Sequence, residues 1–259
     1  MKENSIPSKI KLVEKMITLI GTGHIFDLST ALINIFDEKT PDVICVELDR
    51  QRYNAIMMRQ SNPKAYEDAK KNLPFIYRLL ARFQESMASE YGVNAGDEML
   101  AAINYAQSHG LPAEFIDMNA QHLFIKMWKS MPFSEKFRLL LSGFGGLFVS
   151  KKRVEKELKN LQNDFDVYIE EIGKKFPTIK TTLIDKRNDY MVNRLISLNE
   201  NYEKIITCIG DGHVPGISKL LKLKKIEFET IRLSELRNQE NKDTDSTSGH
   251  FSINYSDYK

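Results

Sequence analysis

Two similar segments, far apart in the sequence, most constrain the fold of this chain. Each is a run of apolar residues that ends in Gly-x-Gly-His, at residues 17–24 and again at residues 205–213. An apolar run that stops at glycines is typical of a buried parallel strand. Ligands of α/β sheets bind outside the carboxyl ends of the strands. The repetition predicts two strands that bring His24 and His213 to one site, although two unrelated strand ends with capping residues remain the alternative.

Three further segments have the character of strands. Short apolar runs at 43–48 and 113–117 and an alternating run at 225–233 are separated by segments with helical periodicity. Crossovers of this length are typical of βαβ units. We therefore expect an α/β fold with a central, mainly parallel sheet and flanking helices.

The domain organisation follows from the same pattern. The 259 residues are enough for one large domain. We expect a single α/β domain over residues 1–237, interrupted by a long, charged helical insertion at about 119–200. Residues 238–259 are polar and are expected to form a disordered tail.

Composition narrows the classes of partner and compartment. A formal net charge of +2 is too small to indicate a nucleic acid or a membrane surface as partner. The two cysteines, Cys45 and Cys208, lie in apolar runs and are expected to be buried hydrophobic residues. Residues 1–15 lack the apolar core of a signal peptide. The expected location is therefore cytoplasmic, and homo-oligomerisation stays open.

The sequence gives little support for a membrane anchor. The apolar run at 139–149 is short and interrupted by glycine, well below the roughly 18 residues of a spanning helix. We expect it to form a buried or interfacial helical turn. Membrane association is thus not supported by the sequence, while peripheral association stays open.

The ends of the predicted strands carry groups that bind metals or transfer protons. His24, Glu47, Asp117 and His213 each follow a predicted strand, and Glu98 begins a helix. Imidazole with carboxylate is a mixture that suits zinc, manganese, iron or cobalt. Without a metal, the same groups can act as acid and base.

Simpler roles compete with these. An acid just after a strand is often a helix cap, and we favour that role for Asp49 and Asp97. His109 is expected to be a cation at a helix C-terminus, whereas His122 is a weaker candidate for the site. Arg52 and Arg187, the latter close to Asp185, suit either a substrate carboxylate or a surface charge.

Five segments resemble the TraB/PrgY pheromone-shutdown family, which is related to the TIKI and GumN proteins. They are the Gly-x-x-His at 21–24, the "PD.V..ELD..R" segment at 41–52, the "G.EM..A" helix from Gly96, the "D.R…M" segment from Asp185, and the second Gly-x-x-His at 210–213. Together they cover most of residues 15–220. One difference is that Met118 follows Asp117, where relatives often have arginine. Many family proteins also carry a C-terminal membrane region, whereas this chain ends in a polar tail.

The resemblance implies a function and a set of site residues. Family proteins are thought to be metal-dependent peptidases or hydrolases, so His24, Glu47 and His213 are expected to bind a divalent manganese, zinc, cobalt or iron ion. By the same resemblance, Glu47, Glu98 and Arg187 are the expected catalytic residues. Arg52, Asp117 and Asp185 are assigned to substrate binding.

Three functions remain after this comparison. The first is a metal-dependent hydrolase, expected to be a peptidase acting on a peptide or pheromone-like substrate. The second is a non-catalytic protein that binds or sequesters a peptide in the same cleft. The third, a phosphate or nucleotide binder, lacks the P-loop lysine and the longer glycine-rich fingerprint.

Overall fold

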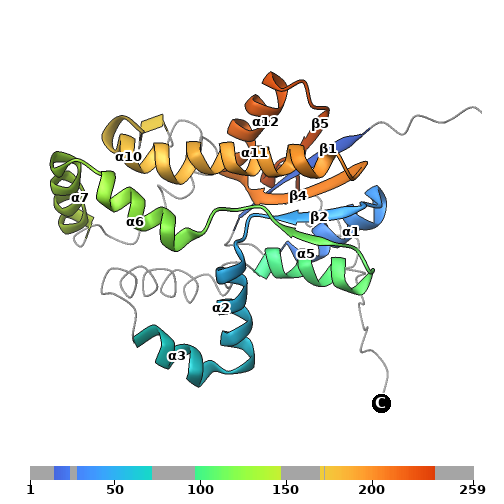
Figure 1. Ribbon diagram of the computed structural model, residues 1–259, viewed down its shortest axis with the longest axis horizontal. Coiled ribbons are helices and arrows are strands. Elements are labelled where there is room, and N and C mark those ends of the chain that lie inside the picture. The colour runs from blue at the N-terminus through green and yellow to red at the C-terminus, as the bar shows by residue number, and fades with distance from the viewer. Residues whose placement is uncertain (1–14, 24–27, 72–96, 147–169, 172, 237–259) are drawn as a thin grey trace, which may run out of the picture.

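A five-stranded, all-parallel sheet forms the centre of the molecule (Figure 1). The computed structural model describes residues 15–23, 28–71, 97–146, 170–171 and 173–236. In the order β3-β2-β4-β1-β5 across the sheet, the strands are β3 (Ala113–Phe115), β2 (Val43–Val46), β4 (Lys204–Gly210), β1 (Met16–Thr22) and β5 (Phe228–Ile231). The predicted α/β class is confirmed, and so are the five predicted strands, with β5 at an edge.

The helices connect these strands and extend beyond the sheet. They are α1 (Ser29–Lys39), α2 (Arg50–Ser61), α3 (Pro63–Lys71), α5 (Asp97–Ser108), α6 (Ala120–Ser130), α7 (Phe133–Gly146), α10 (Pro177–Lys180), α11 (Lys186–Asn199) and α12 (Val214–Leu223). A π-helical turn, η1 (Thr181–Asp185), joins α10 to α11, and a 3-10 turn, η2 (Asp211–His213), joins β4 to α12. Such π-helical turns occur frequently at functional sites.

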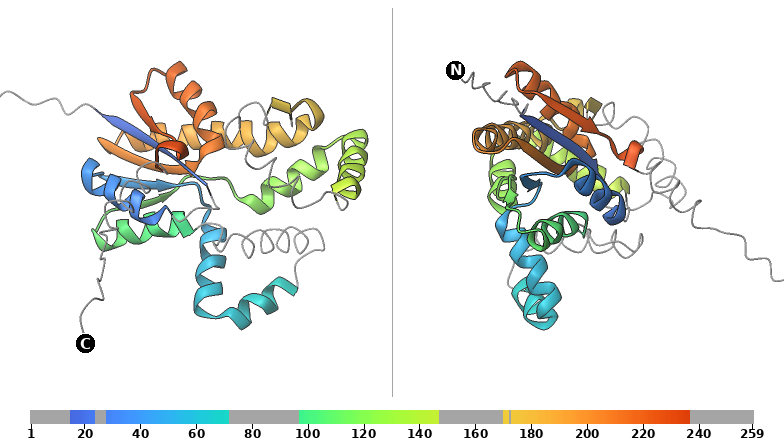
Figure 2. Two further views of the ribbon diagram at one scale, coloured as in Figure 1. Left: turned by 180° about the vertical axis from the view of Figure 1, so that it is seen from behind. Right: turned by 90° about the vertical axis from the view of Figure 1, so that its right-hand side faces the viewer.

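The two faces of the sheet are covered by different helices (Figure 2). Because side chains alternate along a strand, Ile44 and Val46 of β2 pack with α1 and α5, while Val43 and Cys45 pack with α11 and α12. The chain changes face between β3 and β4. In such sheets, ligands bind outside the carboxyl ends of the strands, where neighbouring connections lead to opposite faces.

The two glycine-containing motifs begin on neighbouring strands. β1 pairs with β4 along its whole length, with Gly21 opposite Ile209 and Thr22 opposite Gly210. The two strand ends therefore lie side by side at the carboxyl edge. β4 is also paired with β2 on its other side.

Part of the stretch predicted as an insertion belongs to the helical layer that covers the sheet. α11 covers one face of the sheet through Met191, Val192, Leu195 and Leu198. α6, α7 and α10 instead extend from the carboxyl edge (Figure 1). Residues 147–169 of the predicted insertion and the predicted tail at 238–259 lie outside the described residues.

Both cysteines are buried and free, as expected. Burial raises the pKa of Cys45 and of Cys208 above the ordinary thiol value. Neither thiol is therefore a nucleophile at neutral pH, because the thiolate is the reactive form.

Candidate functional site

Glu47 lies at the centre of the carboxyl edge. It directly follows β2, and its own N–H continues the ladder to Cys208 O of β4 at 2.9 Å. Its carboxylate receives a hydrogen bond from the backbone N–H of Gly210 at 2.6 Å and an ion pair from Arg187. His213 Nε2 lies 3.4 Å from Glu47 Oε1. Glu47 thus joins the strand end of the second glycine motif to helix α11.

Arg187 connects Glu47 to a second carboxylate. Its Nε and Nη2 donate to the two oxygens of Asp117 at 2.9 and 2.7 Å, while Nη2 also pairs with Glu47. Burial alone would lower the pKa of Arg187, but the charges of Glu47 and Asp117 outweigh it and raise the pKa above its ordinary value. Arg187 is therefore a permanent cation fixed between two carboxylates.

The ion pairs that join Glu47, Arg187 and Asp117 form a network, which we call the Glu47 network. It continues to the start of α2. Arg52 pairs with Asp117 and donates from Nε to Asp49 at 2.7 Å. Asp49 also accepts the N–H groups of Gln51 and Arg52, so the predicted N-cap is confirmed. The Asp117 side chain, at 1% exposure, is enclosed by the two arginines.

His213 is buried in η2 and held from behind by Asn188 of α11. Its Nδ1 lies 2.6 Å from Asn188 Oδ1. Because this oxygen can only accept a hydrogen bond, the pairing requires the tautomer of His213 in which Nδ1 carries the proton. Burial lowers the pKa of His213, and the opposing effect of Glu47 offsets this only in part. In this tautomer, the neutral ring directs an unprotonated Nε2 toward Glu47.

Glycines make room for this arrangement. A Cβ on Gly216 would lie 2.2 Å from Asn188 Nδ2, so only glycine lets Asn188 lie where it does. A Cβ on Gly210 would lie 3.3 Å from Glu47 Oε2, which makes this position tight as well. The side chains of Asn188 and Glu47 thus pack directly against the backbone of glycine residues.

The two glycine motifs also contact each other. Asp211 accepts two hydrogen bonds from Arg232, at 2.8 and 2.7 Å, and one from the N–H of Leu233 at 3.0 Å. The same carboxylate occupies the space above Gly21 of the first motif. Asp211 therefore ties the end of β1 to the segment after β5.

The structure places the other predicted residues differently. His24 lies outside the described residues, one position beyond Gly23. Glu98 is buried in the first turn of α5, which begins at the carboxyl edge, and its charge contributes to the raised pKa of Cys208. Asp185 pairs with Lys180 at 2.8 Å and its side chain is 43% exposed, so it is not part of the Glu47 network.

Two open hollows adjoin the network. One, of about 350 Å³, is polar and lies beside Asp117, with Arg50 and Arg194 in its wall. The other, of about 260 Å³, is mainly apolar and is lined by His122, Leu123 and Lys126. Asn119 and Tyr190 line both hollows, so they form neighbouring parts of one depression.

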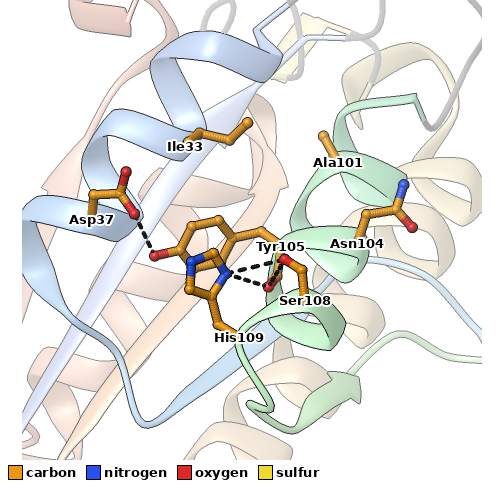
Figure 3. Close-up of a pocket in the computed structure, with 7 residues that line it drawn as sticks. All are labelled: Ile33, Asp37, Ala101, Asn104, Tyr105, Ser108 and His109. Atoms are coloured by element: carbon orange, nitrogen blue, oxygen red, sulfur yellow. Dashed lines mark hydrogen bonds between the residues drawn. The ribbon is translucent and has the colours of Figure 1, made fainter.

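A larger hollow, of about 470 Å³, lies between α1 and α5 (Figure 3). Tyr105 donates to Asp37 at 2.7 Å, and its ring stacks on His109 with centroids 4.0 Å apart. Burial and the bond to Asp37 raise the pKa of Tyr105 to about 12. These are the last turns of helices that lead into the amino ends of β2 and β3, so this hollow lies away from the Glu47 network. His109 follows the end of α5, as predicted.

The sequence of the chain is similar to those of known proteins. The profile of the TraB/PrgY/gumN family matches residues 9–229. This chain belongs to the TraB/PrgY/gumN family. An uncharacterized protein of Methanocaldococcus jannaschii is 32% identical over 218 residues, which are 80% of this chain and 53% of the relative. The chain thus spans about half the length of this relative.

Three important residues were not identified from the sequence. They are Asn188, Asp211 and Arg232. A signal existed for two of them: Asn188 directly follows the predicted Arg187, and Asp211 lies within the second glycine motif. Arg232 lies after an edge strand, and nothing in the local pattern distinguishes it from a surface charge.

Proposed function

We propose that this TraB-family protein is a metal-dependent hydrolase that acts on a peptide bond. The observation that carries the proposal is the bare Nε2 of His213, 3.4 Å from Glu47 Oε1. Both atoms are hydrogen-bond acceptors, so they repel each other unless a cation or a proton lies between them. Because burial keeps His213 neutral, a bound cation is the better partner for the pair.

The donor set fits a divalent ion in its chemistry and spacing. Two ligand atoms about 2.1 Å from an ion, at a tetrahedral angle, lie about 3.4 Å apart. A metal-binding histidine also usually donates its other N–H to an acceptor, as His213 does to Asn188. Imidazole and carboxylate together suit manganese, zinc, cobalt or iron.

A further ligand completes the proposal. Among the described residues, no group of three or more His, Cys, Asp or Glu is arranged to hold a metal. We assign the additional ligand to His24. The chain leaves β1 at Gly21 and Thr22, beside Ile209 and Gly210 of β4.

The residues at the carboxyl edge of the sheet have separate groups of tasks in this proposal. A bound ion would supply polarisation of the scissile carbonyl and a lower pKa for water. Arg187 holds Glu47 in place. It also sets a fixed positive charge beside the oxygen of the scissile carbonyl, on which negative charge develops. Glu47 or Glu98 accepts the proton of the attacking water. Because Asp117 is enclosed, we assign it to positioning Arg187.

The proposal is tested by metal content and peptide cleavage. Protein purified without chelator should contain near-stoichiometric metal, which His213→Ala and His24→Ala should lose and the surface variant His109→Ala should keep. Cleavage of a peptide library should stop with a chelator and return with metal. A wild-type protein that binds none of the four metals and cleaves no peptide would contradict the proposal.

A second candidate is a non-catalytic peptide-binding protein. One observation favours it: the Glu47 carboxylate is already contacted by Arg187, by Gly210 N–H and by His213. The depression beside Asp117 offers a place for a ligand in either case. Peptide binding without turnover, unaffected by chelator, is the result expected of this candidate.

A further inference from the structure

Exposed apolar side chains concentrate on α6 and α7. Of the ten large apolar residues that are exposed in the described part of the chain, five lie between positions 125 and 141. They are Ile125, Trp128, Phe133, Phe137 and Leu141. Phe133 is the most exposed, at 83%. Scattered exposed apolar residues need no explanation, whereas a cluster indicates an interaction surface.

The orientation of α7 is fixed by polar contacts on its inner side. Glu135 is buried and accepts the N–H of Thr178 at 3.0 Å. Arg138 donates from Nη1 to the carbonyl of Lys175 at 2.7 Å. A surface helix usually buries its apolar side and exposes its polar side. Among the described side chains of α7, Glu135 is buried whereas Phe133, Phe137 and Leu141 are exposed.

The outer side of α7 is a continuous apolar face. Phe133, Phe137 and Leu141 are spaced four residues apart, so they lie on one side of the helix. Lys136 Nζ lies 5.4 Å from the centre of the Trp128 ring, which links this side to α6. We call the five exposed residues together the α6–α7 face.

The charges around this face have one sign. Residues 120–146 contain four basic residues and one acid, the buried Glu135. The basic residues are Lys126, Lys129, Lys136 and Arg138. Arg138 contacts Lys175 on the inner side of α7, so the three lysines form the border. On the segment beside α7, Glu170 and Glu171 are matched by Lys174 and Lys175. The α6–α7 face is therefore apolar with a positive border.

We propose that the α6–α7 face binds the surface of a membrane that contains anionic lipids. Phenylalanine, leucine and tryptophan on one side of a helix, with lysines beside them, are typical of helices that lie in the membrane interface. Lipid phosphates match the positive border. Among the described helices, none is long and apolar enough to cross a bilayer.

The charge pattern favours a lipid surface over a second copy of the chain. A twofold dimer places the same patch on both sides of its interface, which would bring the positive border against itself. Figure 1 shows α7 at one end of the molecule, beyond the sheet, where a flat surface can reach it. The proposal is independent of catalysis.

Trp128 makes the proposal directly measurable, because it is the only tryptophan of the chain. Vesicles of phosphatidylcholine with phosphatidylglycerol should shift its emission to shorter wavelength and should carry the protein upward in flotation. Vesicles of phosphatidylcholine alone should do so much less, and high salt should weaken the effect.

Matched variants locate the binding surface. Phe133→Ser and Phe137→Ser should each weaken binding about tenfold, since each removes a buried aromatic ring from the bilayer interface. Leu223→Ser, which removes a residue that is 71% exposed on α12, should leave binding unchanged. Far-ultraviolet circular dichroism should show that all three variants are folded.

Two results would overturn the proposal. One is a wild-type protein that neither floats with anionic vesicles nor changes its Trp128 emission. The other is a dimer in sedimentation analysis that Phe137→Ser dissociates, with no binding to vesicles, which would assign the face to a second copy.

Discussion

Asp211 fills the space above Gly21, so that a Cβ at Gly21 would lie 2.1 Å from Asp211 Oδ1. Asp211 cannot easily move aside, because Arg232 and the N–H of Leu233 hold it. The first glycine motif therefore needs glycine at this position because of a carboxylate in the second motif. The two motifs form one packed unit.

This relationship predicts the effect of Gly21→Ala. The added methyl should lower the free energy of unfolding by about 1–3 kcal/mol, as is usual when a packed site is overfilled. Chemical denaturation measures the change. In an Asp211→Gly background the same substitution should cost clearly less, because the clash is then absent. Equal costs in both backgrounds would show that the contact is not responsible.

Arg187 should be essential for stability as well as for function. Arg187→Met leaves Glu47 and Asp117 close together without their shared cation, and loss of one partner from a buried ion pair costs about 3–5 kcal/mol. Urea unfolding should show this loss. Arg187→Lys should recover part of the stability but little activity, since lysine lacks the forked geometry. Full activity in Arg187→Lys would argue against a positioning role.

Asn188 should control metal binding through His213. Asn188→Ala removes the acceptor that keeps the proton on Nδ1, so metal affinity should fall about 10–100-fold. Gly216→Ala should have a similar effect, because its methyl would displace the Asn188 amide. Isothermal titration calorimetry with each metal measures both variants. Wild-type affinity in a folded Asn188→Ala protein would contradict the assignment.

The lowered pKa of His213 predicts a pH dependence of stability. The unfolded chain takes up this proton near the ordinary value of 6.5, while the folded state resists it. The unfolded state then binds more protons, so stability falls as pH drops below about 6.5. Urea midpoints measured through this range should fall more steeply for wild type than for His213→Gln. Asn188→Asp should raise the pKa of His213, which nuclear magnetic resonance titration would detect.

The fold was largely predictable because its signals are local. Apolar runs before Gly21, Glu47 and Gly210 indicated buried strands. Such runs can be recognised without knowing the rest of the fold. The strand order was not predictable. The side-by-side position of β1 and β4 depends on how helices on both faces pack, which no local pattern encodes.

The site was predictable only in its residue types. Positions at strand ends indicated Glu47, Asp117 and His213, and the structure places all three at the carboxyl edge. The role of Asp117 as a partner of two arginines depends on helices α2 and α11 meeting there. Asn188 directly follows the predicted Arg187, but its contact with His213 is distant in sequence. Arg232 also acts through a distant contact, and its neighbours in sequence gave no indication of its role.

The central position of β4 also determines when the protein becomes complete. β1 and β2 share no hydrogen bonds with each other, because β4 lies between them. During synthesis, β1 and the β2–β3 pair therefore remain unconnected until β4, the strand that joins them, has been made. Glu47 and Arg187 have no His213 to face until that strand inserts. The contacts around Glu47 can therefore form only after β4 and the turn that carries His213 have been synthesised.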